Sequence, residues 1–257
     1  MIGTMKRAVL FIALFAHVCL RAETSFVALN AETNEIIAAS GPDIDTRYSP
    51  CSTFKIALSL AGYDLGILKN EHEPVWLYDG SKAFFESHKT SQSPKTWMSF
   101  SVIWYSKVLA QQIGQSRLQS FLSQFAYGNQ DLSGDGSEEG YKAAHLSSSL
   151  QISPNEQVAF LKHIVNEDLP ISAHAIQMTK EILFERAISD GRLFGKTGSG
   201  FDSNDGMLGW YVGWLESENG KYVFALLMKD LDVFPSKEER QKLVIDLLHS
   251  RFGSVHE

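Results

Sequence analysis

A hydroxyl and an amine lie three residues apart within residues 49–58 of this chain. Pro50 suits the first turn of a helix and apolar residues then recur at helical spacing, so a helix is predicted to begin near Pro50. In that helix Ser52 and Lys55 share one face, beside the unpaired N–H groups and the positive dipole end of the first turn. An attacking hydroxyl, a basic amine and a developing oxyanion could therefore meet there.

A Ser-x-x-Lys pair is a weak motif by itself, because four-residue patterns recur by chance. An ordinary solvated lysine has a pKa of ~10.4 and is protonated at neutral pH. The pair is therefore a hypothesis that needs support from the rest of the chain.

Three further short motifs follow in order. Residues 101–103 are Ser-Val-Ile, inside a helical tract predicted over 97–113. In isolation Ser101 is more simply explained as a core serine bonded to its own backbone. Residues 127–129 are Tyr-Gly-Asn, which predicts a turn, and residues 196–198 are Lys-Thr-Gly.

The elements that must position these motifs are strands at both ends of the chain and helices between them. The predicted strands are 25–29, 35–39, 192–198, 208–215 and 222–228, and the further predicted helices are 116–125, 154–165, 172–185 and 236–249. An α/β fold of the α+β type follows, with a central antiparallel sheet flanked by helices and a second, mostly helical lobe. We expect a single domain over 23–257, with the mixed lobe built from 23–50 and 190–257 and the helical lobe from roughly 60–185.

The composition is that of a globular protein. The 257 residues are 44% hydrophobic and 21% charged, which allows a sizeable core and excludes a disordered chain. Residues 1–22 combine a basic start, a short apolar run and a small final residue. This pattern predicts a signal peptide cleaved after Ala22, with export across the inner membrane to the periplasm and no stable membrane insertion afterwards. A retained N-terminal anchor is the alternative.

Loss of residues 1–22 would lower the formal net charge from −7 to −10. A chain this acidic argues against nucleic acid as a partner. Cys51 would be the only cysteine left, so no internal disulfide is expected. The sequence is compatible with a homodimer.

Taken together and in this order, the four motifs at 52–55, 101–103, 127–129 and 196–198 resemble the signature motifs of class D β-lactamases, the oxacillinases. These belong to the penicillin-recognising serine enzymes. Further similar phrases lie at 146–157 and at 209–214, so the resemblance covers essentially the whole mature chain. Four ordered motifs are far more specific than any one of them.

The resemblance implies a serine β-lactamase that opens the β-lactam amide of penicillins. Ser52 would be the nucleophile that forms an acyl-enzyme. Lys55 would be the general base after its amine has reacted with CO2 to a carbamate (N6-carboxylysine), which requires an apolar pocket that disfavours the ammonium. No metal and no cofactor other than CO2 or bicarbonate is implied, and Cys51 is interpreted as a packing residue.

The resemblance also assigns the remaining site residues. Ser101 would bridge Lys55 and Lys196 and pass a proton to the leaving nitrogen, and the backbone N–H groups of Ser52 and Ser199 would form the oxyanion hole. Besides Lys196, which is also catalytic, the implied substrate-binding residues are Thr197, Gly198, Ser199, Arg240, Ile103 and Tyr127. For Arg240 a solvated helix charge is the alternative.

Two positions depart from the family pattern. Ile103 stands where valine is usual, and His145 stands where most class D enzymes have a tryptophan whose indole N–H binds the carbamate. A neutral imidazole also donates one hydrogen bond, but it is smaller and tolerates water, so slower deacylation is expected. His145 could be a tolerated natural variation, an engineered change or the mark of an acyl-enzyme trap.

Two other functions remain as alternatives. A β-lactam-acylated sensor or trap domain would bind penicillins without efficient turnover. A peptidoglycan D-Ala-D-Ala peptidase would share the Ser-x-x-Lys and Lys-Thr-Gly motifs, but such enzymes generally have Ser-x-Asn as the middle motif. Residues 101–103 lack that amide, which argues against a peptidase.

Overall fold

The structure is a computed structural model that describes residues 23–252 except 79, 82, 84, 138–139, 190 and 203–205. The predicted signal peptide at 1–22 lies outside the described residues.

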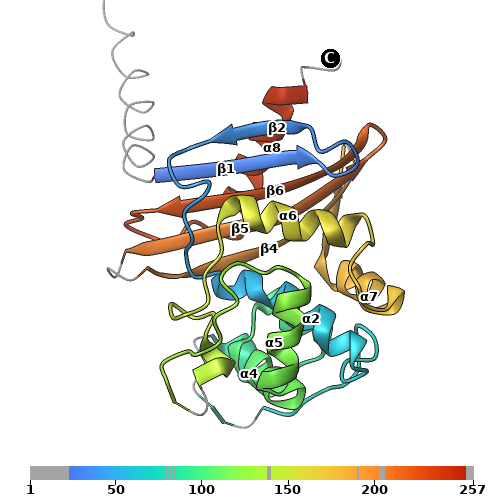
Figure 1. Cartoon of the computed structure of the whole chain (residues 1–257), viewed down its shortest axis with the longest axis vertical. Coiled ribbons are helices and arrows are strands. Elements are labelled where there is room, and N and C mark those ends of the chain that lie inside the picture. Colours follow the sequence, from blue (N-terminus) through green and yellow to red (C-terminus); the bar gives the residue numbers. More distant parts are fainter. Residues whose placement is uncertain are drawn as a thin grey trace, which may run out of the picture.

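Six antiparallel strands form one sheet, in the order β2-β1-β6-β5-β4-β3 (Figure 1). They are β1 (Glu23–Asn30), β2 (Ile36–Ser40), β3 (Phe184–Ile188), β4 (Gly191–Phe201), β5 (Met207–Ser217) and β6 (Gly220–Lys229). Because β1 pairs with β6 along its whole length, the two ends of the chain meet in the middle of the sheet. The predicted central antiparallel sheet built from both ends of the chain is therefore confirmed.

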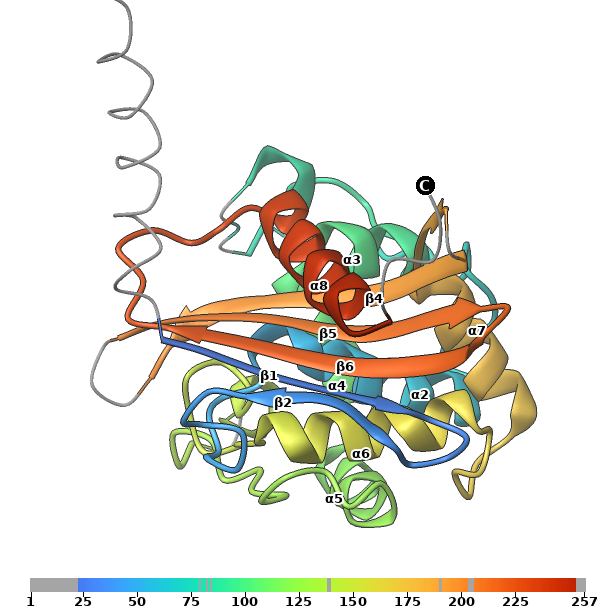
Figure 2. The same cartoon turned by 90° about the horizontal axis from the view of Figure 1, so that it is seen from above.

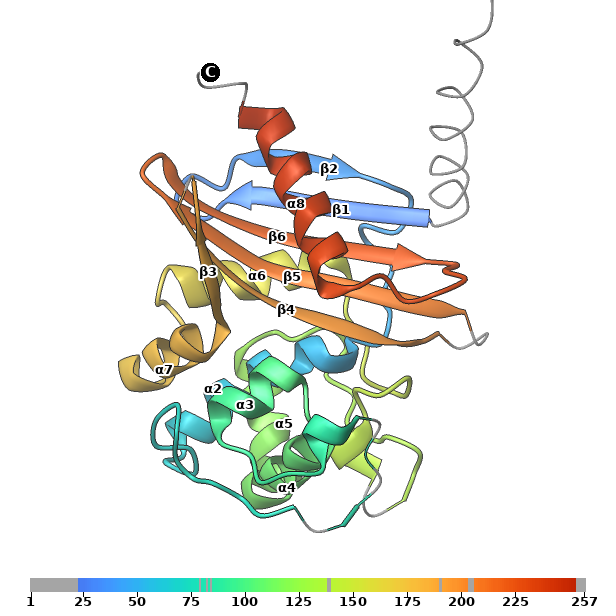
Figure 3. The ribbon, with the colours of Figure 1, turned by 180° about the vertical axis from the view of Figure 1, so that it is seen from behind.

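Helices cover both faces of the sheet. The helices are α2 (Lys55–Asp64), α3 (Pro94–Phe100), α4 (Ile103–Ile113), α5 (Gln115–Gln124), α6 (Pro154–Val165), α7 (Ala173–Leu183) and α8 (Lys237–Phe252), with short 3-10 turns η1 (Cys51–Phe54), η2 (Glu86–His88) and η3 (Gly140–Ala143). Seen from above, α8 and α6 lie on opposite faces (Figure 2), and from behind α8 crosses the strands (Figure 3). Helices α2, α4 and α5 form a lobe beyond β4 (Figure 1), whereas α6, which falls within the predicted helical stretch 60–185, packs on β6, β1 and β5.

The alternation of side chains along β5 divides the core in two. Trp210, Val212 and Trp214 join the large core shared with α2, α4 and α6. Tyr211 and Leu215 point to the opposite face and join the smaller core under α8. The sheet is therefore buried on both faces, and substrate access is left to its edge and to the helical lobe.

Helix starts agree with their sequence signals in three places. Ser93, Ser153 and Ser236 each accept a hydrogen bond from the backbone N–H three residues later, and the side chain at that later position bonds back to the serine N–H. These reciprocal bonds satisfy two N–H groups that a helix start leaves unpaired. The predicted starts of α6 and α8 are confirmed.

Three boundaries differ from the prediction. The tract 97–113 is two helices, because Ser101 takes a left-handed conformation with φ of 62° between α3 and α4. Gly114 rather than Ser116 caps α5, which begins at Gln115. The helix predicted over 172–185 ends at Leu183, because the next five residues pair with β4 as β3.

Candidate active site

The first hydroxyl–amine pair lies where η1 runs into α2. Lys55 is completely buried, Ser52 is partly exposed, and Lys55 Nζ donates a hydrogen bond to Ser52 Oγ at 3.1 Å. Burial lowers the pKa of Lys55 from 10.5 to about 7, because an apolar surrounding disfavours the ammonium. A buried amine that is about half neutral at pH 7 therefore faces a partly exposed hydroxyl.

A second hydroxyl–amine pair joins the helical lobe to the sheet. Lys196 on β4 is 4% exposed, and its Nζ donates to Ser101 Oγ at 2.9 Å and to the carbonyl of Thr197 at 2.8 Å. Burial, and then the nearby charge of Lys55, hold the pKa of Lys196 well below its usual value. The effect of the Lys55 charge on Lys196, together with the packing of β4 against η1, places both pairs in one site. The simpler sequence interpretation of Ser101, a serine bonded within its own helix, is wrong.

The close approach of β4 to η1 depends on glycine. A Cβ on Gly198 would lie 3.0 Å from the carbonyl oxygen of Pro50 and 3.2 Å from Thr53 Cγ2. A Cβ on Gly200 would lie 2.6 Å from Cys51 Sγ. Gly198 is itself buried. Its role in the predicted substrate site is therefore to let β4 pack against η1, the turn that contains Ser52.

The edge of β4 is open beside Ser52. Strand β3 pairs only with Gly191–Phe194, and within the described residues no strand covers the later part of that edge. Thr197 is partly exposed and Ser199 is exposed there. An open strand edge offers backbone N–H and C=O groups to a ligand.

Arg240 on α8 supports this edge from behind. It is 3% exposed, and its Nη1 donates to the carbonyls of Gly198 at 2.7 Å and Trp210 at 3.0 Å, while Nη2 donates to Ser199 Oγ at 2.8 Å. Burial lowers its pKa to about 10, which still leaves a cation at neutral pH. The alternative of a solvated helix charge is therefore wrong.

His145 lies in the wall next to Lys55. It is completely buried, its ring lies 5.1 Å from that of Phe54, and among the described residues neither ring nitrogen has a hydrogen-bond partner. Burial, and then the charge of Lys55, hold the pKa of His145 well below its usual value. His145 is therefore a neutral imidazole with a free donor and a free acceptor.

The Tyr-Gly-Asn motif packs against Phe54 and against the segment that follows His145. Tyr127 has no exposed surface and lies between the rings of Phe54 and Phe160, so in this conformation it does not contact substrate. Asn129 Nδ2 donates to the carbonyl of Ser149 at 2.8 Å, and Asn129 Oδ1 accepts from the N–H of Gln151 at 2.9 Å. The motif thereby fixes the segment that follows His145.

Ile103, the first residue of α4, is partly exposed two residues after Ser101. This position is compatible with the pocket wall implied for it.

Sequence reasoning missed Ser49, whose hydrogen bonds join three segments of the chain. Its Oγ donates to the carbonyl of His145 at 2.8 Å and accepts from the N–H of Ser147 at 2.9 Å. Its carbonyl accepts from Trp210 Nε1 at 2.9 Å. Only the residue type, a serine before Pro50, could have suggested this role.

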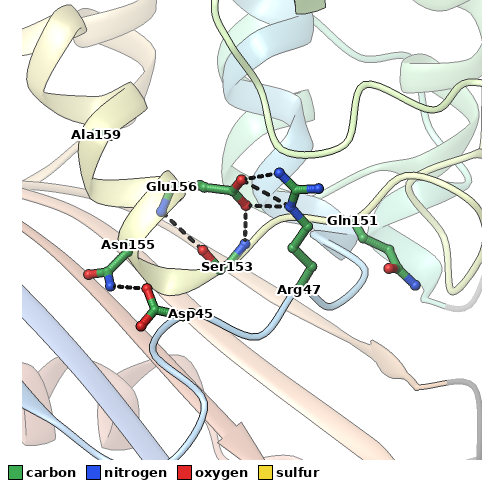
Figure 4. Close-up of a pocket in the computed structure, with 7 residues that line it drawn as sticks. All are labelled: Asp45, Arg47, Gln151, Ser153, Asn155, Glu156 and Ala159. Carbon is green, nitrogen blue, oxygen red and sulfur yellow. Dashed lines mark hydrogen bonds and ion pairs between the residues drawn. The ribbon is translucent and has the colours of Figure 1, made fainter.

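A separate, open hollow of about 690 Å³ lies at the start of α6 (Figure 4). It is lined by Asp45, Arg47, Gln151, Ser153, Asn155, Glu156 and Ala159. Its charged groups are mostly paired with one another: Arg47 binds Glu156 through two nitrogens, and Asn155 Nδ2 donates to Asp45 Oδ1 at 2.6 Å. None of the predicted catalytic residues lines it.

Within the part of the chain that the structure describes, no three His, Cys, Asp or Glu side chains gather into a group that could hold a metal ion. In the same part, no helix combines the length and the apolar character needed to cross a membrane.

The fold and the two pairs define a penicillin-recognising serine protein, and residues 24–247 match the family profile of the penicillin binding protein transpeptidase domain. Beta-lactamase OXA-1 of Escherichia coli is 40% identical over 207 residues, which cover 79% of this chain and 74% of that protein. Beta-lactamase OXA-9 of Klebsiella pneumoniae is 35% identical over 215 residues, 78% of each chain.

Solved structures give the same result. The class D β-lactamase OXA-427 matches with a TM-score of 0.80 and 34% identity, covering 87% of this chain and 96% of that one. FUS-1 (OXA-85), a class D β-lactamase from Fusobacterium nucleatum subsp. polymorphum, matches with a TM-score of 0.80 and 28% identity, covering 96% and 99%. The chain belongs to the class D β-lactamases.

Proposed function

We propose that this enzyme hydrolyses the β-lactam amide of penicillins through an acyl-enzyme on Ser52, with carbamylated Lys55 as the general base. The observation that carries the proposal is the fully buried Lys55 amine 3.1 Å from the partly exposed Ser52 hydroxyl. Burial lowers the pKa of Lys55 to about 7, so about half of the amine is neutral at pH 7 and available to form the carbamate.

The surroundings of Lys55 fit a carbamate. A neutral amine is the form that reacts with CO2, and the buried His145 offers a ring N–H without a partner. When present, the carbamate supplies an anionic acceptor for the Ser52 proton. His145 and Ser52 would be the donors that hold it. The imidazole is smaller than the indole that most class D enzymes have at this position and tolerates water, so deacylation is the step expected to suffer.

The second pair serves the leaving group and the substrate carboxylate. Ser101, held by Lys196 Nζ at 2.9 Å, passes its proton to the lactam nitrogen as the amide opens and regains one from the Lys55 base, which has taken the Ser52 proton. Lys196, Thr197 and Ser199 bind the carboxylate along the open edge of β4, and Arg240 adds positive charge behind Ser199. The backbone N–H groups of Ser52 and Ser199 stabilise the oxyanion, where one such donor is typically worth about 2.7–4 kcal/mol.

The enzyme acts after export, in the periplasm, on penicillins that enter there. The basic and apolar pattern of residues 1–22 supports this location. The mass of the secreted protein tests it, because cleavage after Ala22 removes 22 residues, whereas a retained anchor leaves the full chain.

Purified enzyme should hydrolyse oxacillin, and added bicarbonate should raise the steady-state rate. Ser52→Ala should abolish both turnover and covalent labelling by penicillin. Lys55→Met should abolish turnover with and without bicarbonate, whereas Lys95→Met, which removes an exposed lysine paired with Glu71, should leave both unchanged. Labelling that survives in Ser52→Ala would refute the proposed nucleophile.

A β-lactam-acylated trap or sensor is the second candidate, and the missing tryptophan at His145 favours it. A trap would be labelled at Ser52 by penicillin and would then release no product. If labelling is complete and no turnover appears with or without bicarbonate, the trap replaces the hydrolase.

A further inference from the structure

The joint between α3 and α4 is strained at the residue that meets Lys196. Helix α3 ends at Phe100, Ser101 has a left-handed φ of 62°, and Val102 returns to an extended conformation. Residues other than glycine rarely hold such a φ unless neighbouring groups impose it. The N–H groups of Ser101 and Val102 both donate to the carbonyl of Trp97 and so hold the turn from the α3 side. The position of Ser101 Oγ depends on this turn.

His88 in η2 bonds to both sides of the joint. Its Nε2 donates to the carbonyl of Phe100 at 2.8 Å, since a carbonyl oxygen only accepts and Nε2 must then carry the hydrogen. The carbonyl of His88 accepts from Trp104 Nε1 at 2.7 Å. One residue thus holds the last carbonyl of α3 and the first turn of α4, on either side of Ser101.

The environment of His88 keeps this bond closed to water. His88 is 5% exposed, and the ring of Phe85 covers it edge-on with 5.1 Å between ring centres. Burial lowers the pKa of His88, so the ring is neutral at neutral pH. Because Nε2 is the donor to the Phe100 carbonyl, this bond fixes one orientation of the His88 ring.

We propose that His88 is a positioning residue of the β-lactamase reaction: its bond to the Phe100 carbonyl sets the left-handed turn at Ser101 and holds Ser101 Oγ on Lys196 Nζ. The inference rests on the proposed proton transfer through Ser101. Without the bond, the turn relaxes and the hydroxyl moves away from the leaving nitrogen. Substrate binding along β4 does not use His88, and the proton transfer belongs to acylation. Therefore kcat/KM, which reports acylation, falls, whereas kcat changes little as long as deacylation is the slower step.

Two variants of equal length separate the hydrogen bond from packing. His88→Gln places an amide N–H three bonds from Cβ, as the imidazole does, and His88→Met fills a similar space without a donor. With oxacillin, His88→Met should lower kcat/KM by about 10- to 100-fold, the range expected when a catalytic group is misplaced by about 1 Å. His88→Gln should keep most of the wild-type kcat/KM.

His174→Met is the matched control. His174 Nε2 also bonds to a backbone carbonyl, that of Lys69 at 3.1 Å, but it joins α7 to a distant loop. Its kcat and KM should equal those of the wild type. A loss of activity in His174→Met as large as in His88→Met would overturn the proposal, because any histidine-to-carbonyl bond would then serve.

Ser101→Ala separates this inference from the proposed function. If Ser101→Ala leaves kcat/KM intact, the proton transfer through Ser101 is wrong. If Ser101→Ala lowers kcat/KM and His88→Met does not, only the role of His88 is wrong. Where both lower kcat/KM, adding His88→Met to Ser101→Ala should cost nothing more, since the two changes remove the same contribution.

Trp104→Phe keeps the test decisive if His88→Met does not fold. It removes the other bond, to the carbonyl of His88, and leaves an aromatic ring in place. It should also lower kcat/KM. An unchanged kcat/KM in folded Trp104→Phe, or equal losses in His88→Gln and His88→Met, would refute the positioning role.

Discussion

The ammonium form of Lys55 should destabilise the folded enzyme. The side chain is fully buried, and burial lowers its pKa from 10.5 to about 7. At about 1.4 kcal/mol per pKa unit, a shift of this size corresponds to about 5 kcal/mol. Lys55→Met keeps the length and removes the charge, so in CO2-free buffer at acidic pH it should raise the free energy of unfolding by up to about 5 kcal/mol.

The gain should shrink as the pH rises. The unfolded chain keeps Lys55 protonated up to its ordinary pKa of 10.5, whereas the folded enzyme releases that proton near pH 7. Between these values the unfolded state binds more protons, so the stability of the wild type rises with pH. The advantage of Lys55→Met should fall from about 5 kcal/mol near pH 6 to about 2 kcal/mol near pH 9.

Urea unfolding of both proteins at the two pH values measures this difference. Lys95→Met is the control, because an exposed lysine is worth at most about 1 kcal/mol at either pH. Added bicarbonate should stabilise the wild type and leave Lys55→Met unchanged, since a carbamate that forms only in the folded state favours folding. Equal gains at both pH values, or a variant less stable than the wild type near pH 6, would refute the reasoning.

Three further predictions concern the supports of the site. Ser153→Ala removes the cap of α6 and should lower the free energy of unfolding by about 1 kcal/mol in urea titration. Gly128→Ala combines a φ of 51° with a Cβ 2.0 Å from the carbonyl of Gln151, so the same titration should show a loss of about 1–3 kcal/mol or more. Arg240→Met removes charge-assisted bonds worth about 1.5–3 kcal/mol, one of them to Ser199, and should raise KM for penicillins by about tenfold or more in steady-state kinetics.

Sequence patterns were sufficient where local chemistry decides the structure. The hairpin of β1 and β2, the pairing of β5 with β6 and the start of α6 follow from alternation, turn residues and capping residues over a few positions. The proximity of Ser52 and Lys55 is also a local matter, because a separation of three residues at the start of a helix brings the two side chains together.

The remaining errors share one cause, which is that a distant contact decides a local conformation. Apolar periodicity continues through residues 97–113, so it hides the joint at Ser101, where Lys196 and the His88 bond determine the backbone. The end of α7 is hidden in the same way, because β3 forms only where β4 offers a partner. The burial of Arg240 depends on two carbonyls, at positions 198 and 210, that lie far away in the sequence.

Stability and chemistry oppose each other around Lys55. An ammonium in this pocket disfavours the folded state, and so does a buried imidazole with two unpaired nitrogens. Protonation of His145 would only add a second positive charge beside Lys55. An acceptor placed between the two side chains would relieve both, because it would accept a hydrogen bond from the ring N–H of His145 and its formation would remove the charge from Lys55. The same acceptor is what Ser52 would need in order to lose its proton. The histidine at residue 145 would therefore change how firmly that acceptor is held, while leaving in place the physical reason for having one.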